Sequence, residues 1–218
     1  MQDIATNRAP AAPVEVSPDN PCPFLRGLVA NGYVGGHIVP LPELTDTIKR
    51  ATGKTGLAAL FAGAQIFGVA MIANGAPFRS LREGAILDQL RNGPLDKHGA
   101  GSRILDQHAV VHEDEIARLA TFGSDYSNPD GGTERGLNAA EIKTFMRANF
   151  QRAKDDHPWY WGILHGYYRI MMLGEWPVLL DILGKGDGKD RYLSVAEVKT
   201  LFVERSFPAR IVALLDRK

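Results

Sequence analysis

The sequence predicts a mainly α-helical single domain with long irregular connections, and three observations support this fold class. Apolar residues recur at intervals of three and four along most of the chain, and few stretches alternate with the period of a strand. Two helices are expected to begin at capping boxes, at Asn138 to Glu141 and at Ser194 to Glu197. No internal linker divides the 218 residues, a length that suits one compact domain with room for a cofactor pocket.

The predicted elements follow in chain order. Residues 1–19 are rich in alanine and proline and show no periodicity, which predicts an extended arm before a helical domain over residues 20–218. Besides the helices that follow the two capping boxes, we expect helices from Phe24 to a stop at Asn31-Gly32, from Leu44 to a stop at Gly53, and over Leu57–Ala73, Ile86–Leu90, Ile104–Phe122, Trp159–Leu173 and Val178–Leu183.

Composition excludes several classes of protein. The 25 basic and 25 acidic residues give a net charge of zero, which argues against a nucleic-acid binder. The single cysteine excludes an internal disulfide. The most apolar run, Leu57 to Ala73, is short for a membrane span and predicts a buried core helix. Because the first residues lack the apolar core of a signal peptide, we expect a cytoplasmic protein, or an exported one only if a signal was removed.

Two twelve-residue segments, Asp130–Glu141 and Gly186–Glu197, have part of the spacing of a calcium-binding loop. Each places a leucine at the inner apolar position and a glutamate at position 12. Each also carries an arginine, Arg135 or Arg191, where the turn requires glycine, and a glycine where a ligand is required. Because capping boxes explain both glutamates, the sequence predicts that these loops do not bind calcium.

The histidines His108 and His112 are four residues apart. If both lie on one helix, their imidazoles share a face and can bind a metal ion. A transition-metal site would need a third ligand, such as Glu113 or Glu115. The other interpretation is a partly buried histidine pair with local hydrogen bonds.

The segment around Cys22 carries the most chemical information. Pro23 suits the first position of a helix, because it has no backbone N–H and its φ is fixed. This places Cys22 at the N-cap, where unpaired N–H groups and the positive end of the helix dipole favour the thiolate. A thiolate is a ligand for heme iron and promotes cleavage of an O–O bond. On these residues alone, a buried structural cysteine is the alternative.

The run from Asn20 to Gly36, NPCPFLRGLVANGYVGG, resembles the opening signature of the heme-thiolate peroxidases, the chloroperoxidase and unspecific peroxygenase family. In that family, Pro-Cys-Pro leads into a helix that ends in Ala-Asn-His-Gly or a similar sequence, and the cysteine is the proximal heme ligand. Here Asn31-Gly32 lacks the intervening histidine. The resemblance implies an all-helical fold, heme b as cofactor and Cys22 as the axial ligand of its iron.

Later segments resemble landmarks of the same family in the same order. Gly174-Glu175 before an apolar run is similar to the segment that supplies the distal acid–base glutamate, which implies a catalytic role for Glu175. The segment from Leu201 to Pro208 is similar to the closing Phe-x-x-Glu-Arg-x-Pro element.

The stretch from Leu105 to Arg118 is similar to the family segment that carries Glu-His-Asp or Glu-Gly-Asp. Alignment on Arg118 places His112 and Glu113 on the family histidine and aspartate, whereas alignment on His108 makes the triplet His112-Glu113-Asp114. In the family this region helps to bind magnesium beside a heme propionate, and in some members its histidine assists the distal glutamate. The resemblance therefore implies Glu113 as a possible magnesium ligand and His112 as a catalytic candidate.

The function implied is that of a peroxidase or peroxygenase, which uses hydrogen peroxide to oxidise or oxygenate small organic substrates through a ferryl intermediate. One base that becomes an acid would accept a proton from peroxide and return it to the departing oxygen. Glu175 is the first candidate for this role because its neighbours are apolar, and His112 would assist or replace it. The alternatives are a heme-binding protein without turnover, and a non-heme metal enzyme built on His108 and His112. Neither the substrate nor the oligomeric state follows from the sequence.

Overall fold

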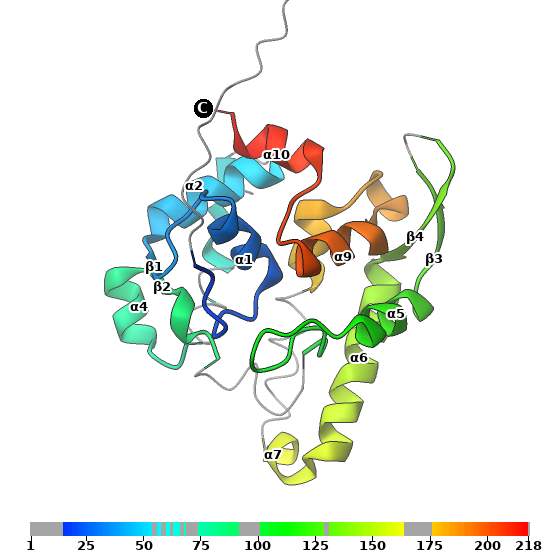
Figure 1. Cartoon of the computed structure of the whole chain (residues 1–218), viewed down its shortest axis with the longest axis horizontal. Coiled ribbons are helices and arrows are strands. Elements are labelled where there is room, and N and C mark those ends of the chain that lie inside the picture. The colour runs from blue at the N-terminus through cyan, green and yellow to red at the C-terminus, as the bar shows by residue number, and fades with distance from the viewer. Residues whose placement is uncertain are drawn as a thin grey trace, which may run out of the picture.

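The structure is a computed structural model of the chain (Figure 1). It describes residues 15–53, 56, 57, 60, 61, 63–65, 68, 74–91, 101–128, 131–163 and 176–217.

The N-terminal region consists of short helices beside a two-stranded antiparallel sheet, in which Ile38 pairs with Ile86 and Val39 with Ala85. Its elements are α1 (Pro23–Ala30), β1 (Ile38–Val39), α2 (Leu41–Thr52), α4 (Pro77–Glu83), β2 (Ala85–Ile86) and the 3-10 helix η1 (Leu87–Gln89).

The C-terminal region is built around a three-stranded antiparallel sheet in the order β3-β4-β5. Figure 1 shows the long helix α6 extending away from this sheet, with α7 at its far end. The elements of the region are α5 (Glu113–Thr121), β3 (Ser124–Ser127), β4 (Thr133–Asn138), α6 (Ala139–Asp156), α7 (Pro158–Ile163), a helical segment over residues 176–183, the 3-10 helix η3 (Gly188–Asp190), β5 (Tyr192–Ser194), α9 (Val195–Val203) and α10 (Ala209–Leu215).

One hydrophobic core joins the two regions and contains buried residues from Phe24 in α1 to Leu215 in α10. The Phe24 ring packs edge-on against Phe207, with 5.6 Å between ring centroids. Gly27 allows this approach, because a Cβ at that position would lie 2.7 Å from the Phe207 ring. The helix that begins after Cys22 is therefore packed directly against the C-terminal part of the chain.

Helix ends that carry local signals lie where the sequence predicts them. α1 ends at Asn31-Gly32, and α2 ends at Gly53, whose φ of +62° is a left-handed conformation that glycine adopts readily. α6 begins with a complete capping box, in which Asn138 Oδ1 accepts from the Glu141 N–H (3.0 Å) and Glu141 Oε2 accepts from the Asn138 N–H (2.7 Å).

The expectation of an all-helical fold is correct only in part, because the chain is helix-rich but also forms two small sheets. The strands are between two and six residues long, too short to show clear alternation. The helix expected over Ile86–Leu90 is wrong: Ile86 pairs with Ile38, and a single 3-10 turn follows.

The helix expected over Ile104–Phe122 is shorter than predicted, since α5 begins only at Glu113. A bridge between Leu105 and Val111 closes the preceding residues into a loop. Asp106 Oδ1 stabilises this loop by accepting from the backbone N–H groups of His108 (2.8 Å) and Val110 (2.9 Å). Such side-chain-to-backbone bonds compete with helix formation.

The apolar run Leu57–Ala73 was expected to form a buried core helix. Its described positions are helical, but Leu57 is 73% exposed and Phe61 is 71% exposed, so the prediction of burial is wrong for these side chains. The other positions of the run lie outside the described residues. Among the residues that are described, no helix is both long enough and apolar enough to cross a membrane.

Residues 15–19, the described part of the predicted arm, form neither helix nor strand. Two arginines hold them against the body of the protein: Arg26 Nη1 donates to the Ser17 carbonyl (3.0 Å), and Arg91 Nε donates to the Pro18 carbonyl (2.9 Å).

Candidate functional site

Cys22 occupies the N-cap of α1, with Pro23 at the first helical position, as the sequence predicts. Its backbone N–H donates to Asn20 Oδ1 (3.1 Å), and its carbonyl accepts the first helical bond from Arg26 (2.9 Å). The cysteine is half-buried and packs against the edge of the core. Its sulfur thus lies at the positive end of a helix, the setting that favours a thiolate.

Arg26 lies one turn after Cys22 and is almost completely buried. Its Nη1 group donates to the carbonyls of Ser17 and Asn20, whereas its Nε atom is buried and has no hydrogen-bond partner within the described part of the chain. The side chain therefore places a cation close to the cysteine at the start of α1.

Two further arginines contribute positive charge near this position. Burial, together with the charges of Arg205 and Arg91, lowers the pKa of Arg26 to about 10, while the negative charge of an ionised Cys22 acts in the opposite direction. Arg26 nevertheless stays protonated at neutral pH. Among these three arginines, Arg26 is the one whose charge is shown to interact with Cys22, and a nearby cation favours a thiolate.

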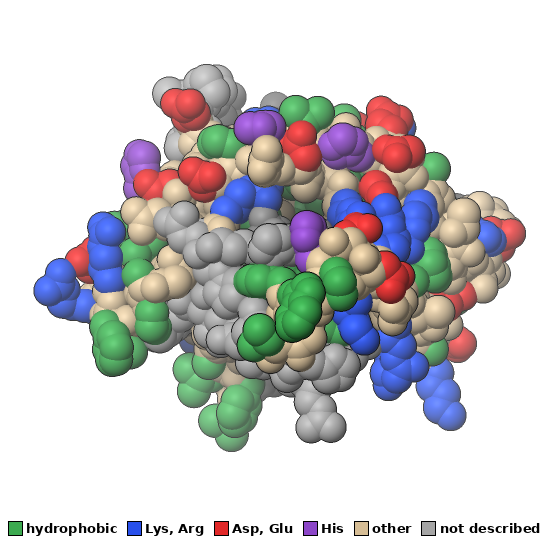
Figure 2. Space-filling model, turned by 90° about the horizontal axis from the view of Figure 1, so that it is seen from below, with side chains coloured by type: hydrophobic (Ala, Val, Ile, Leu, Met, Phe, Trp, Pro, Cys, Tyr) green, Lys and Arg blue, Asp and Glu red, His purple; other side chains and the backbone are tan. Residues whose placement is uncertain are grey.

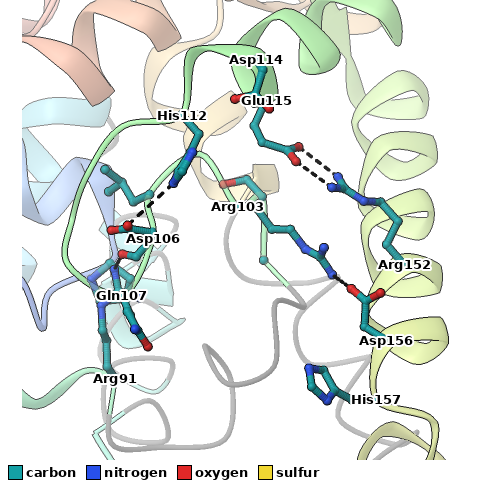
Figure 3. Close-up of a pocket in the computed structure, with 14 residues that line it drawn as sticks. Arg91, Arg103, Asp106, Gln107, His112, Asp114, Glu115, Arg152, Asp156 and His157 are labelled. Carbon is teal, nitrogen blue, oxygen red and sulfur yellow. Dashed lines mark hydrogen bonds and ion pairs between the residues drawn. The ribbon is translucent and has the colours of Figure 1, made fainter.

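A cavity of about 620 Å³ opens beside this segment and is lined by Pro21, the residue before Cys22. Its volume is typical of sites that hold cofactors or small organic ligands. Figure 3 shows His112, Asp106, Gln107 and Arg91 on one side of the cavity, with Arg152 and Asp156 of α6 on the other. Figure 2 shows a face of the molecule on which cationic and anionic side chains lie close together, while hydrophobic side chains protrude nearby.

The loop that precedes α5 forms part of the cavity wall and contains strained backbone. Arg103 and Ala109 have φ values of +61° and +59°, which are unusual for residues other than glycine. Arg103 Nη2 donates to Asp156 Oδ2 (2.7 Å), and Arg91 Nη2 donates to the Asp106 carbonyl (2.7 Å). These bonds hold the two guanidinium groups at the cavity.

The wall formed by α5 and α6 contains a two-point ion pair. Arg152 donates to both carboxylate oxygens of Glu115, at 2.7 and 3.0 Å, and Arg118 lies 3.6 Å from the same carboxylate. The hydrogen bonds from Arg152 outweigh the effect of burial and hold the pKa of Glu115 below its usual value. Glu115 is therefore a charged structural group and unsuited to act as a proton donor near neutral pH.

His112 lines the cavity, and its Nε2 atom lies 3.7 Å from Asp106 Oδ2. The residue is the N-cap of α5, whereas His108 belongs to the preceding loop and contacts Gln107. The premise that both imidazoles share a helix face is therefore wrong. The described residues contain no group of three or more histidine, cysteine or acidic side chains that could hold a metal ion.

Glu113 does not line the cavity with His112. Its side chain is exposed and pairs with Lys199 of α9, with 2.9 Å between Oε2 and Nζ. Magnesium ligation by Glu113 stays a prediction, and it would require the carboxylate to leave Lys199.

Glu175, the expected distal acid–base residue, lies outside the described residues. The next residue, Trp176, is buried against Phe145 and Phe202, with ring centroids 5.2 and 6.2 Å away. The helical segment that follows Glu175 is therefore firmly anchored in the core.

The arginines around the cysteine and the cavity were not predicted from the sequence. Arg26 could have been found, because it follows Cys22 by four residues and so lies on the same face of α1. Arg91, Arg103 and Arg152 come from three separate segments, and only the folded chain brings them to one cavity.

No protein-family model matches the chain, and a search of curated proteins finds no significant match. The functional assignment therefore rests on the site itself and on the resemblance of short motifs. Cys22 itself is not among the residues that line the cavity, whereas its neighbour Pro21 is. Arg91 and Arg103 do line it, and guanidinium groups can pair with the carboxylates of a ligand, but Arg91 already donates to the Asp106 carbonyl and Arg103 to Asp156.

Proposed function

We propose that this protein is a heme-thiolate peroxidase or peroxygenase that uses hydrogen peroxide to oxidise or oxygenate small organic substrates. The observation that carries the proposal is the position of Cys22, at the N-terminus of α1, one turn before the buried Arg26 and directly after Pro21, which lines a cavity of about 620 Å³. When bound, heme b would supply the activation of peroxide and the oxidation of substrate.

Each residue of the site would have a distinct role. The helix dipole and the charge of Arg26 would favour the ionised form of Cys22, which would hold the heme iron. Arg91 and Arg103 would bind the propionates and so orient the cofactor in the cavity. Magnesium bound at Glu113 would be an addition to this arrangement and is not required by it.

The use of peroxide would require one of its oxygens to lose a proton and the other to gain one. Glu175 is the proposed carrier, by its similarity to the family glutamate. His112 Nε2 is a second base at the cavity, held near Asp106. Either the Glu175 carboxylate or His112 Nε2 could accept the proton from one peroxide oxygen and return it to the other.

Peroxide turnover by the hemin-reconstituted protein tests this proposal. We expect the wild-type protein to oxidise a one-electron dye with peroxide, and Glu175→Gln to lose at least tenfold in kcat. His112→Gln serves as the matched variant, and a comparable loss there would assign the proton transfer to His112. Heme binding without turnover in the wild-type protein would overturn the enzymatic proposal and leave a heme-binding protein.

A further inference from the structure

The two calcium-type loops of the sequence lie side by side in the structure. β4 belongs to the first loop and β5 to the second, and the two strands pair antiparallel with Leu137 opposite Leu193. The leucines predicted at the inner apolar positions are both fully buried. The chain thus pairs a strand of the first loop with a strand of the second, although the two loops are far apart in sequence.

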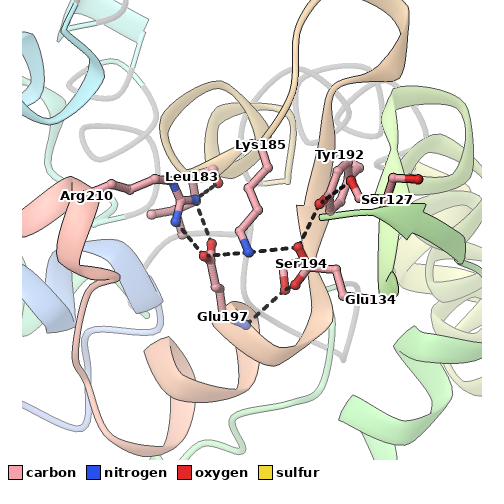
Figure 4. A network of polar contacts seen from close by, with 8 residues as sticks. All are labelled: Ser127, Glu134, Leu183, Lys185, Tyr192, Ser194, Glu197 and Arg210. Carbon is pink, nitrogen blue, oxygen red and sulfur yellow. Dashed lines mark hydrogen bonds and ion pairs between the residues drawn. The ribbon is translucent and has the colours of Figure 1, made fainter. Parts of the chain in front are cut away.

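A lysine occupies the space between the acidic side chains of these loops (Figure 4). Lys185 Nζ lies 2.7 Å from Glu134 Oε1 and 3.2 Å from Glu197 Oε1. Glu134 holds position 5 of the first loop, and Glu197 holds position 12 of the second, which are two positions where calcium loops place ligands. One ammonium group therefore bridges carboxylates from both loops.

The remaining oxygen atoms are also satisfied by donors from the protein. Glu134 accepts from the hydroxyl groups of Tyr192 (2.7 Å) and Ser194 (2.8 Å). Although burial opposes it, the hydrogen bonds from Lys185 and these two hydroxyl groups keep the pKa of Glu134 below its usual value. Both Glu134 oxygens thus accept hydrogen bonds from other side chains of the protein.

Arg210 of α10 completes the network through Glu197. Its guanidinium group binds both carboxylate oxygens of Glu197 and also donates to the Leu183 carbonyl. Glu197 therefore does not close the predicted capping box, although Ser194 still caps α9 by accepting from the Glu197 N–H (3.5 Å). Two cations thus face two carboxylates, and the network ties α10 and α9 to the end of the helix over residues 176–183.

In the first loop, the glutamate at position 12 also accepts hydrogen bonds from the protein, but here the donors are neutral. Glu141, at position 12, accepts from Ser124 Oγ (2.5 Å) and Tyr126 OH (2.7 Å) of β3, in addition to the capping-box N–H of Asn138. In both loops, the glutamate at position 12 therefore accepts hydrogen bonds from donors of the protein.

We propose that the Lys185 ammonium and the Arg210 guanidinium neutralise the carboxylates that calcium-binding loops use as ligands, which makes the paired loops a clamp that needs no metal. This inference does not rest on the proposed enzymatic function. It assigns Lys185 and Arg210 as internal ligands of the clamp, and it predicts that removal of the ammonium opens a site of carboxylate and hydroxyl oxygens for a divalent or lanthanide cation.

The wild-type protein provides the first test. Its melting temperature in excess EDTA should equal that in millimolar CaCl2, and added Tb³⁺ should give no tyrosine-sensitised luminescence. A rise in melting temperature with calcium, or terbium luminescence, would overturn the proposal.

The variant Lys185→Met provides the second test, with Lys199→Met as its control because Lys199 forms an exposed pair elsewhere. In EDTA, Lys185→Met should melt roughly 5 °C below wild type, and CaCl2 should restore part of that loss. Terbium should luminesce in this variant, since Tyr192 hydrogen-bonds Glu134. A folded Lys185→Met that responds to neither ion would overturn the proposal. Arg210→Met is tested in the same way, so the result does not depend on one variant folding.

Discussion

The paired-loop clamp and the cavity beside Cys22 use the same kinds of side chain to different ends. In the clamp, the side chains of Lys185, Glu134 and Glu197 are 13–16% exposed and that of Arg210 is 37% exposed, and each carboxylate oxygen has a donor from the protein. At the cavity, Arg152 is 35% exposed and Asp156 is 52% exposed, and the backbone is strained at Arg103. Complete pairing makes the clamp a structural unit, whereas open space beside charged groups allows the cavity to take a ligand.

Neutralising one glutamate should lower the free energy of unfolding more in the clamp than at the cavity wall. Glu197→Gln removes a charge that both Lys185 and Arg210 contact, and leaves Glu134 as the one described carboxylate beside Lys185, whose side chain is only 13% exposed. We expect a loss of about 3 kcal/mol in the free energy of unfolding, measured by urea denaturation. Glu204→Gln, at an exposed position just after α9, is the control and should be nearly neutral.

The cavity wall should respond less to the equivalent change. Glu115→Gln weakens the pairs with Arg152 and Arg118, whose side chains are 35% and 26% exposed and so less buried than that of Lys185, and should cost about 1–2 kcal/mol in the free energy of unfolding. If this loss equals or exceeds that of Glu197→Gln, the contrast between the two regions is incorrect.

Acid should weaken both regions. The pKa values of Glu115 and Glu134 are lowered in the folded protein, so each contributes stability above the ordinary glutamate pKa of about 4.3. That contribution falls as the pH decreases from there through the lower folded-state pKa. The melting temperature should therefore drop between pH 5 and 3 (roughly the range in which unfolded glutamates take up protons), and Glu115→Gln should show a smaller drop than wild type.

An exposed ion pair gives the smallest effect. Lys199→Met removes the partner of Glu113, and both side chains are more than half exposed. The free energy of unfolding should change by no more than about 0.5 kcal/mol in urea denaturation. A larger loss would mean that the exposure of an ion pair does not determine how much it contributes to the free energy of unfolding.

Features that depend on neighbours in the sequence were predictable. Pro23 after Cys22, Gly53 at the end of α2 and the box from Asn138 to Glu141 each act within one helical turn, and each lies where expected. The N-cap position of Cys22, the basis of the proposed function, belongs to this group.

Features that depend on distant segments were not predictable. The strand pair Leu137–Leu193 is too short to show a period, and α5 begins late because Asp106 binds its own loop. The cations of the clamp also come from distant positions: Lys185 and Arg210 reach Glu197 only after folding. The sequence predicted that the two loops do not bind calcium, but the pairing of their glutamates with Lys185 and Arg210 could be found only in the structure.

The most direct test of the central claim is the visible spectrum of the hemin-reconstituted protein, reduced and exposed to carbon monoxide, beside that of Cys22→Ser. We predict a strongly red-shifted Soret band for the wild-type protein and its loss in the variant, because only a thiolate ligand produces that shift. A wild-type protein that binds no hemin, or a Soret band that is the same in both proteins, would contradict heme ligation by Cys22.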